Sequence, residues 1–149
     1  MPTRADLTEK ILAVKRRKGL KWKEIAAQLG GNSPVWYTAA LQGQMPLSAD
    51  EAAKAATLFE LDEDETLLLQ EIPYRGSLPT AVPTDPLIYR FYELVQVYGT
   101  TWKALIQEEF GDGIMSAIDF DMAIEREPNP KGDRVRITMS GKFLSYKVY

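Results

Sequence analysis

Apolar residues return at intervals of three and four up to about Gln70, which is the spacing of amphipathic helices. The apolar face of the first such segment consists of Leu7, Ile11, Leu12 and Val14. Asp6 is placed to cap this helix, and Gly19 follows a basic last turn and is placed to end it. We predict five helices in all: one between Asp6 and Gly19, one over Trp22–Leu29, one opening at Ser33–Pro34, one opening at the capping box Ser48–Glu51, and one over Asp62–Gln70.

The helical pattern breaks at residues 72–86. This stretch contains four prolines and one glycine, a composition typical of a linker or an extended loop. We therefore place a domain boundary here, with an all-helical bundle over residues 1–76 and a second domain over residues 77–149.

The second half mixes two periodicities. Asp85–Pro86 predicts the start of a helix that ends at Gly99, and Thr100 or Thr101 is placed to cap another that ends near Phe110. Beyond Ile118 the period falls to two. Alternating apolar residues predict one strand around Phe120, Met122 and Ile124 and another around Val135, Ile137 and Met139, joined by the turn-rich stretch Glu127–Asp133. Ser140–Gly141 predicts a turn into a third strand over Lys142–Tyr149. The chain is therefore predicted to be α+β.

Composition narrows the chemistry. Of the 149 residues 45% are hydrophobic, enough to build a core, and the chain has neither His nor Cys. A Ser-His-Asp triad, a Cys nucleophile, a Cys/His zinc site and a disulfide are all excluded. We expect no metal site, because the spacing of a calcium loop is also missing. The N-terminus lacks an apolar signal segment and no apolar run approaches a membrane span, so we expect a cytoplasmic protein without membrane contact.

The second and third predicted helices have the spacing of a helix-turn-helix, and the whole first half resembles the phage-repressor type of five-helix bundle. One interpretation is a DNA-binding regulator. The other is a scaffold or subunit-contact module, and three observations favour it. The predicted recognition helix, Ser33–Ala40, has no Arg, Lys, Asn or Gln to pair with base edges. Residues 1–76 carry ten Lys and Arg against eleven Asp and Glu, so this half has no basic surplus for phosphates, and the chain as a whole has a net charge of −3. The basic run Lys15–Lys18 is also typical of a solvated helix end.

Arg90 and Glu93 are three residues apart on the helix that opens at Pro86, beside Tyr89 and Tyr92. Residues at this spacing are neighbours on a helix surface. The pair can be an ordinary surface ion pair, worth under about 1 kcal/mol. It can also be an anion site, because a guanidinium offers a fixed fork of donors suited to carboxylate-like oxygens.

Ser116 is a polar residue inside the apolar run Ile114–Ile118, directly after the turn Gly111–Gly113. It can be a small core serine bonded to its own backbone. Alternatively, its hydroxyl and the nearby N–H groups can face a small anion in a dry pocket. Because the chain has no histidine to activate it, we expect Ser116 to bind and polarise rather than to attack.

The residues themselves resemble the cyanase (cyanate hydratase, cyanate lyase) family over essentially the whole chain. The segments that carry the resemblance are Val82–Pro86, Tyr89–Glu93, Gln96–Thr101 and Glu109–Ile118, with Leu61–Asp64 and Leu67–Gln70 in the first half. The family's catalytic arginine and glutamate match Arg90 and Glu93, and its catalytic serine matches Ser116.

The resemblance implies bicarbonate-dependent decomposition of cyanate to carbamate, and then to ammonia, with release of carbon dioxide. It implies bicarbonate as a co-substrate and no cofactor. It also implies a repressor-like helical bundle followed by a small α/β dimerisation domain, with dimers joined into a homodecamer whose active sites lie where subunits meet. Glu93 stays open between two roles, orienting Arg90 or handling the bicarbonate proton.

Overall fold

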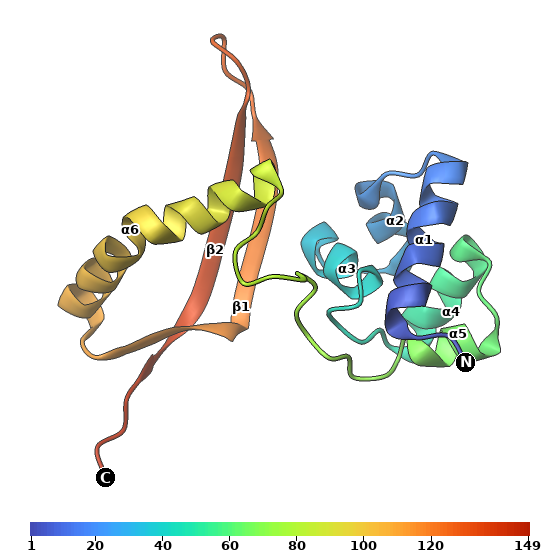
Figure 1. Cartoon of the computed structure of the whole chain (residues 1–149), viewed down its shortest axis with the longest axis horizontal. Coiled ribbons are helices and arrows are strands. Elements are labelled where there is room, and N and C mark those ends of the chain that lie inside the picture. Colours follow the sequence, from blue (N-terminus) through green and yellow to red (C-terminus); the bar gives the residue numbers. More distant parts are fainter. The chain divides into compact units, whose positions relative to one another are not determined.

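The computed structural model describes all of residues 1–149 and divides into two compact units, Met1–Ser77 and Leu78–Tyr149 (Figure 1). The first unit is helical, with α1 (Arg4–Lys18), α2 (Trp22–Leu29), α3 (Pro34–Leu41), α4 (Ala49–Phe59) and α5 (Glu63–Leu68). The second consists of one helix and a two-stranded antiparallel sheet, α6 (Pro86–Phe110), β1 (Gly113–Glu127) and β2 (Arg134–Ser145). The predicted α+β class is confirmed.

All five predicted helices of the first unit form, and most begin and end where local capping chemistry directs. Ser33, Ser48 and Asp62 cap α3, α4 and α5 through their side chains. The cap of α1 was predicted wrongly. Thr3 is the N-cap, and its hydroxyl accepts the N–H of Asp6 while the Asp6 carboxylate accepts the N–H of Thr3 at 2.8 Å. Asp6 is thus the acidic partner of a capping box that opens three residues earlier.

The C-terminus of α1 is set by Gly19, as predicted. Its φ of 65° lies in the left-handed region, where a glycine has no Cβ to oppose the conformation.

The hydrophobic core lies entirely in the first unit. Its largest fully buried side chains are Tyr37, Phe59, Leu7, Ile11, Ile25, Leu29, Leu41 and Leu69. Leu12, which was predicted to share the apolar face of α1, is 37% exposed and stands outside this core. The reason is geometric, because position 12 is rotated by about 100° from position 11 on a helix.

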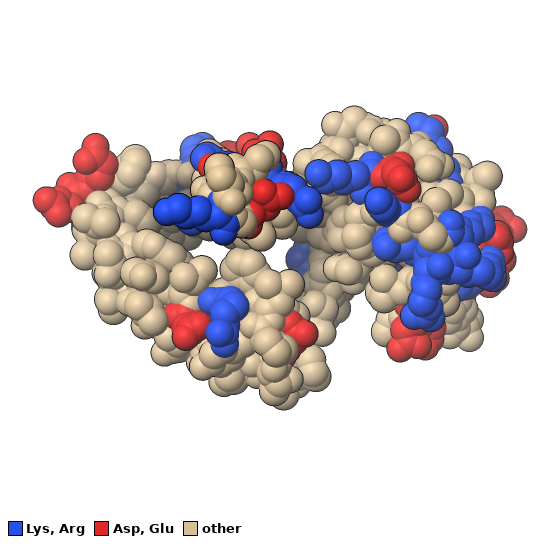
Figure 2. Space-filling model, turned by 90° about the horizontal axis from the view of Figure 1, so that it is seen from above, with Lys and Arg blue, Asp and Glu red and all other residues tan.

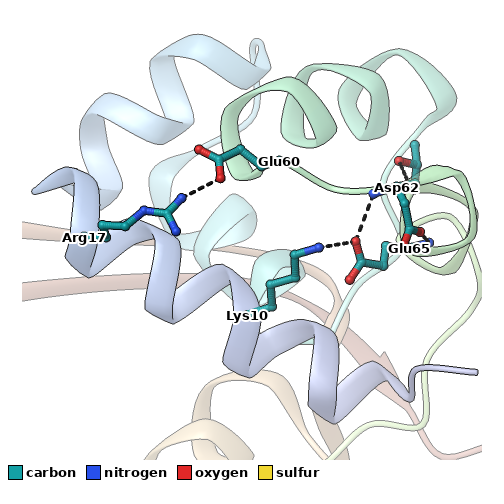
Figure 3. Close-up of polar contacts among 6 residues, drawn as sticks. Lys10, Arg17, Glu60, Asp62 and Glu65 are labelled. Atoms are coloured by element: carbon teal, nitrogen blue, oxygen red, sulfur yellow. Dashed lines mark hydrogen bonds and ion pairs between the residues drawn. The ribbon is translucent and has the colours of Figure 1, made fainter.

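Ion pairs tie α1 to the end of α4 and the start of α5 (Figure 3). The Lys10 ammonium meets the buried Glu65 carboxylate, which also accepts the N–H of Asp62 at 2.9 Å. Farther along α1, Arg17 pairs with Glu60. The first unit is therefore closed by specific polar contacts as well as by its core.

The second unit corrects two sequence-based predictions. The first concerns α6, which runs without interruption from Pro86 to Phe110, with Gly99 in its interior. A glycine disfavours a helix interior by only about 1 kcal/mol, and the apolar stripe that ends at Tyr98 continues at Trp102 and Leu105 with helical spacing. The helix-forming pattern on both sides outweighs the glycine, so Thr100 and Thr101 lie within the helix rather than at its start.

The second correction concerns the sheet. Ser140–Gly141 is not a turn, and Lys142 does not open a third strand, because β2 continues to Ser145 and Gly141 pairs with Phe120 of β1. The predicted turn over 127–133 does join the two strands. Phe110, at the end of α6, stacks on Phe143 of β2 with ring centroids 5.1 Å apart.

The second unit has no hydrophobic core of its own within one chain. No residue of α6 is buried, and its stripe residues are between 41% and 69% exposed: Leu87, Phe91, Leu94, Val95, Tyr98, Trp102 and Leu105. No helix of the protein has the combination of length and hydropathy that a membrane-crossing segment needs.

Candidate active site

Arg90 lies in the second turn of α6, and the local sequence fixes where that turn begins. The Asp85 carboxylate caps the helix by accepting the N–H groups of Leu87 and Ile88, at 2.9 and 3.0 Å. Pro86 at the first helical position has the φ that the helix requires and lacks an N–H that would otherwise be unpaired.

Arg90 and Glu93 form the ion pair that their spacing predicted. Arg90 Nε is 3.4 Å from Glu93 Oε2, and the side chains are 61% and 49% exposed. A pair this exposed adds little to stability, so a stabilising role does not account for it. The contact uses the Nε edge of the guanidinium, and no ion pair or hydrogen bond within the chain occupies the two terminal nitrogens. Those nitrogens form the fork that suits a planar oxyanion.

Tyr89 and Tyr92 stand beside this pair, also as predicted. The Arg90 guanidinium carbon is 5.3 Å from the centroid of the Tyr89 ring, and the two tyrosine rings are 5.8 Å apart. A guanidinium over a ring face is attracted by the ring quadrupole. Arg90 is thus held between an aromatic ring and a carboxylate, with its terminal nitrogens free.

Ser116 lies in β1 and is buried, with 5% of its surface exposed. Its Oγ accepts the N–H groups of Ile118 and Asp119, each at 3.0 Å. The predicted bonding of Ser116 to its own local backbone is therefore confirmed. This bonding still leaves Ser116 able to bind an anion. A hydroxyl has one proton and two lone pairs, and both lone pairs are occupied here. The remaining capacity of Ser116 is to donate its proton.

The single chain does not join the three predicted residues. Arg90 and Glu93 contact each other, but no hydrogen bond or ion pair links either of them to Ser116. Sequence reasoning did not identify which N–H groups serve Ser116. A signal was available in the break between the apolar run Ile114–Ile118 and the alternation that begins at Phe120, because a change of pattern within one strand is typical of a bulge. Elsewhere, no three carboxylates gather in a way that could hold a metal ion.

The basic residues of the first unit are largely engaged within the unit. Lys18 pairs with Glu60 at 3.0 Å and donates to the Leu58 carbonyl, while Lys15 lies 4.8 Å from the centroid of the Trp22 ring. Figure 2 shows Lys and Arg side chains gathered over the helical unit with acidic groups next to them. This surface is a mixed one, which does not favour the DNA-binding interpretation.

Comparison with known proteins covers both units. The family described as "Cyanate hydratase, N-terminal" matches residues 4–73, and the "Cyanate lyase C-terminal domain" matches residues 80–148. The chain is 63% identical to the cyanate hydratase of Methylibium petroleiphilum over 147 residues, which is 99% of each protein. It is also 63% identical to that of Ralstonia pickettii over 146 residues, 98% of this chain and 99% of the relative.

The fold agrees with this similarity. The crystal structure of cyanase from T. urticae superimposes with a TM-score of 0.79 at 37% sequence identity, covering 93% of this chain and 96% of the other. None of these relatives is named as a DNA-binding protein, and both units are matched as parts of one enzyme family. The chain therefore belongs to the cyanate hydratase (cyanate lyase) family.

Proposed function

We propose that this protein is a cyanase that decomposes cyanate with bicarbonate as co-substrate, using Arg90, Glu93 and Ser116. Cyanate, bicarbonate and one proton give carbamate and carbon dioxide, and carbamate takes up a second proton to give ammonia and carbon dioxide. The observation that carries the proposal is the 63% identity to cyanate hydratases, which extends over 99% of the chain and includes both units. We assign the reaction no cofactor and place it in the cytoplasm, a reducing compartment with which a chain that can form no disulfide agrees.

The reaction requires two anions to be held in contact as a dianionic adduct. The two anions repel each other and must also be aligned for reaction. A positioned cation with rigid donors offsets the repulsion and fixes the alignment. Arg90 supports this role because its terminal nitrogens are free while Glu93 meets its Nε at 3.4 Å. A cation about 4 Å from an anion contributes on the order of 4 kcal/mol at an effective dielectric of about 20, before desolvation is subtracted.

Of the two roles considered for Glu93, the geometry favours orientation. A carboxylate against Nε fixes the plane of the guanidinium without blocking its fork. Ser116 complements this arrangement, since the N–H groups of Ile118 and Asp119 occupy its lone pairs and its proton is left to donate to an anion. In this proposal neither Glu93 nor Ser116 acts as a nucleophile.

We propose further that the site is completed by self-association into a homodecamer of five dimers. The number of subunits is what the family resemblance implies, and two observations support association itself. Ser116 makes no hydrogen bond to Arg90 or Glu93 within one chain. The second unit also leaves its apolar helix stripe exposed and the outer edges of its two-stranded sheet unpaired, and association would cover them. Closed symmetry would then bring Arg90 from more than one subunit to a shared pocket.

The test is ammonia release from cyanate, measured with and without bicarbonate. We expect release only when both anions are present. Arg90→Lys should lower turnover on the order of a hundredfold, because a point charge cannot reproduce the fork, and Ser116→Ala should lower it by a similar factor. Arg126→Lys and Ser140→Ala are matched controls, since Arg126 is an exposed arginine paired with a carboxylate and Ser140 is an exposed serine of the same sheet.

Unchanged turnover in Arg90→Lys would remove the arginine from the site. Bicarbonate-independent ammonia release would contradict the two-anion reaction. Duplex DNA binding that weakens steeply with salt, with no ammonia release, would favour the regulator instead.

A further inference from the structure

The hairpin of the second unit contains a large bulge at Ser116. Two residue pairs flank it, Met115 with Phe143 and Phe120 with Gly141. Residues 116–119 of β1 therefore stand opposite Lys142 alone on β2. A bulge leaves its extra residues unpaired and bends the strand, and here the Ser116 hydroxyl supplies an acceptor for two of the unpaired N–H groups.

Gly141 lies against this bulge with no room for a side chain. A Cβ built at Gly141 would overlap the carbonyl oxygen of Ser116 and would stand 2.7 Å from Met115 Cγ. Both separations are below 3.0 Å, which real Cβ atoms essentially never show. The Met115 side chain could move, but the Ser116 carbonyl is backbone. Any side chain at position 141 must therefore displace the residue that carries the hydroxyl.

We propose that Gly141 is a positioning residue for Ser116. Its missing side chain lets the bulge close onto β2, so that both N–H groups reach the Ser116 oxygen and the proton is left for the substrate anion. This inference rests on the proposed function, because a serine outside the reaction would need no positioning. Gly141 itself touches no substrate and acts only through Ser116.

The test is a double-mutant cycle of Gly141→Ala and Ser116→Ala in the full-length assembled protein. Turnover, the Michaelis constant for cyanate, assembly size and melting temperature are measured for each variant. Gly141→Ala should lower kcat by about tenfold to a hundredfold, the scale of a misplacement near 1 Å. In the Ser116→Ala background, Gly141→Ala should lower kcat by no further than about twofold, the usual scatter of additive effects.

Gly113→Ala provides the matched control. A Cβ at Gly113 would overlap the Leu144 carbonyl and stand 2.6 Å from Phe143 Cζ, so the strain falls on the same hairpin but on other atoms. Its effect on kcat should be the same with or without the Ser116 hydroxyl.

Three outcomes of the mutant cycle overturn the inference, and they can be told apart. If Ser116→Ala is fully active, the proposed role of the serine has failed and positioning fails with it. If Ser116→Ala is impaired while Gly141→Ala matches the unaltered protein, only the positioning role fails. If Gly141→Ala lowers kcat equally in both backgrounds, Gly141 is merely structural. Should Gly141→Ala not assemble, an experimental structure of the unaltered protein decides, and a gap of side-chain size between Gly141 and Ser116 would also refute the proposal.

Discussion

The two units of this chain differ in how far their apolar side chains are removed from water within one chain. Residues 1–77 bury a complete core, with Tyr37, Phe59 and Ile11 each at most 1% exposed, and cap nearly every helix with a nearby side chain. Residues 78–149 bury no large apolar side chain, although their helix and strands are rich in them. Apolar surface contributes to stability only when it is removed from water, by about 25 cal/mol per Å². The first unit removes it within the chain, whereas in the second unit it stays exposed, and we propose that another copy of the chain covers it.

The largest effect is expected from a charge placed on the apolar stripe of α6, which tests whether the second unit depends on another copy. Val95 is 54% exposed in the single chain, so Val95→Asp should leave the chain folded but abolish assembly, because a carboxylate cannot be buried without a partner. Light scattering after size exclusion measures the mass. Gln107→Asp, on the opposite side of the same helix, is the control and should keep the assembled mass. A fully assembled Val95→Asp protein would refute the role of the stripe.

The counterpart in the first unit is a large-to-small change in its core. Phe59 is completely buried, and Phe59→Ala should lower the free energy of unfolding of this unit by about 3–5 kcal/mol. Denaturant titration followed by tryptophan fluorescence in a Trp102→Phe background reports on the first unit alone, where the other two tryptophans lie. The assembled mass should stay unchanged. Equal losses of stability and of assembly would show that the units are not independent.

A smaller effect is expected from the helix caps. The Ser48 hydroxyl accepts the N–H of Glu51 at 3.3 Å, and the Glu51 carboxylate accepts the N–H of Ser48 at 2.9 Å. Ser48→Ala should therefore lower the stability of the first unit by about 1 kcal/mol. Ser77→Ala is the matched control, since Ser77 is exposed and caps nothing. The same fluorescence titration compares the two variants, and identical unfolding curves would show that the Ser48 cap does not stabilise this unit.

The smallest effect depends on pH. Hydrogen bonds from Lys18 and Arg17 lower the pKa of Glu60 in the folded protein, so the unfolded chain binds its proton more readily. The contribution is present above the pKa of the unfolded chain, about pH 4, and is lost as pH falls through the lower folded value. Glu60→Gln should therefore be slightly less stable than the unaltered protein at pH 7, and the difference should shrink as pH falls below about 4, measured by thermal melting. A difference that stays constant as pH falls would assign the effect to packing.

Local chemistry explains which features could be predicted from the sequence. A helix cap needs partners only three residues apart, so Ser33, Ser48 and Asp62 were identified correctly, and the Arg90–Glu93 pair follows from helix spacing alone. In the first unit the one cap predicted wrongly, Asp6 for Thr3, was still the other half of the same capping box.

The glycines show what the sequence alone could not decide. Gly19 ends a helix in the left-handed region, Gly99 lies inside a helix, and Gly141 lies inside a strand where the Ser116 carbonyl leaves no space for a side chain. A glycine permits all three conformations, and the surrounding contacts select one. The apolar stripe of α6 is a similar case: the sequence determined that it exists, and only packing against another surface determines what covers it. Contacts between residues that are distant along the chain, or on different chains, are set by tertiary and quaternary structure. The reason is that a local sequence pattern does not specify which distant residue will pack against it.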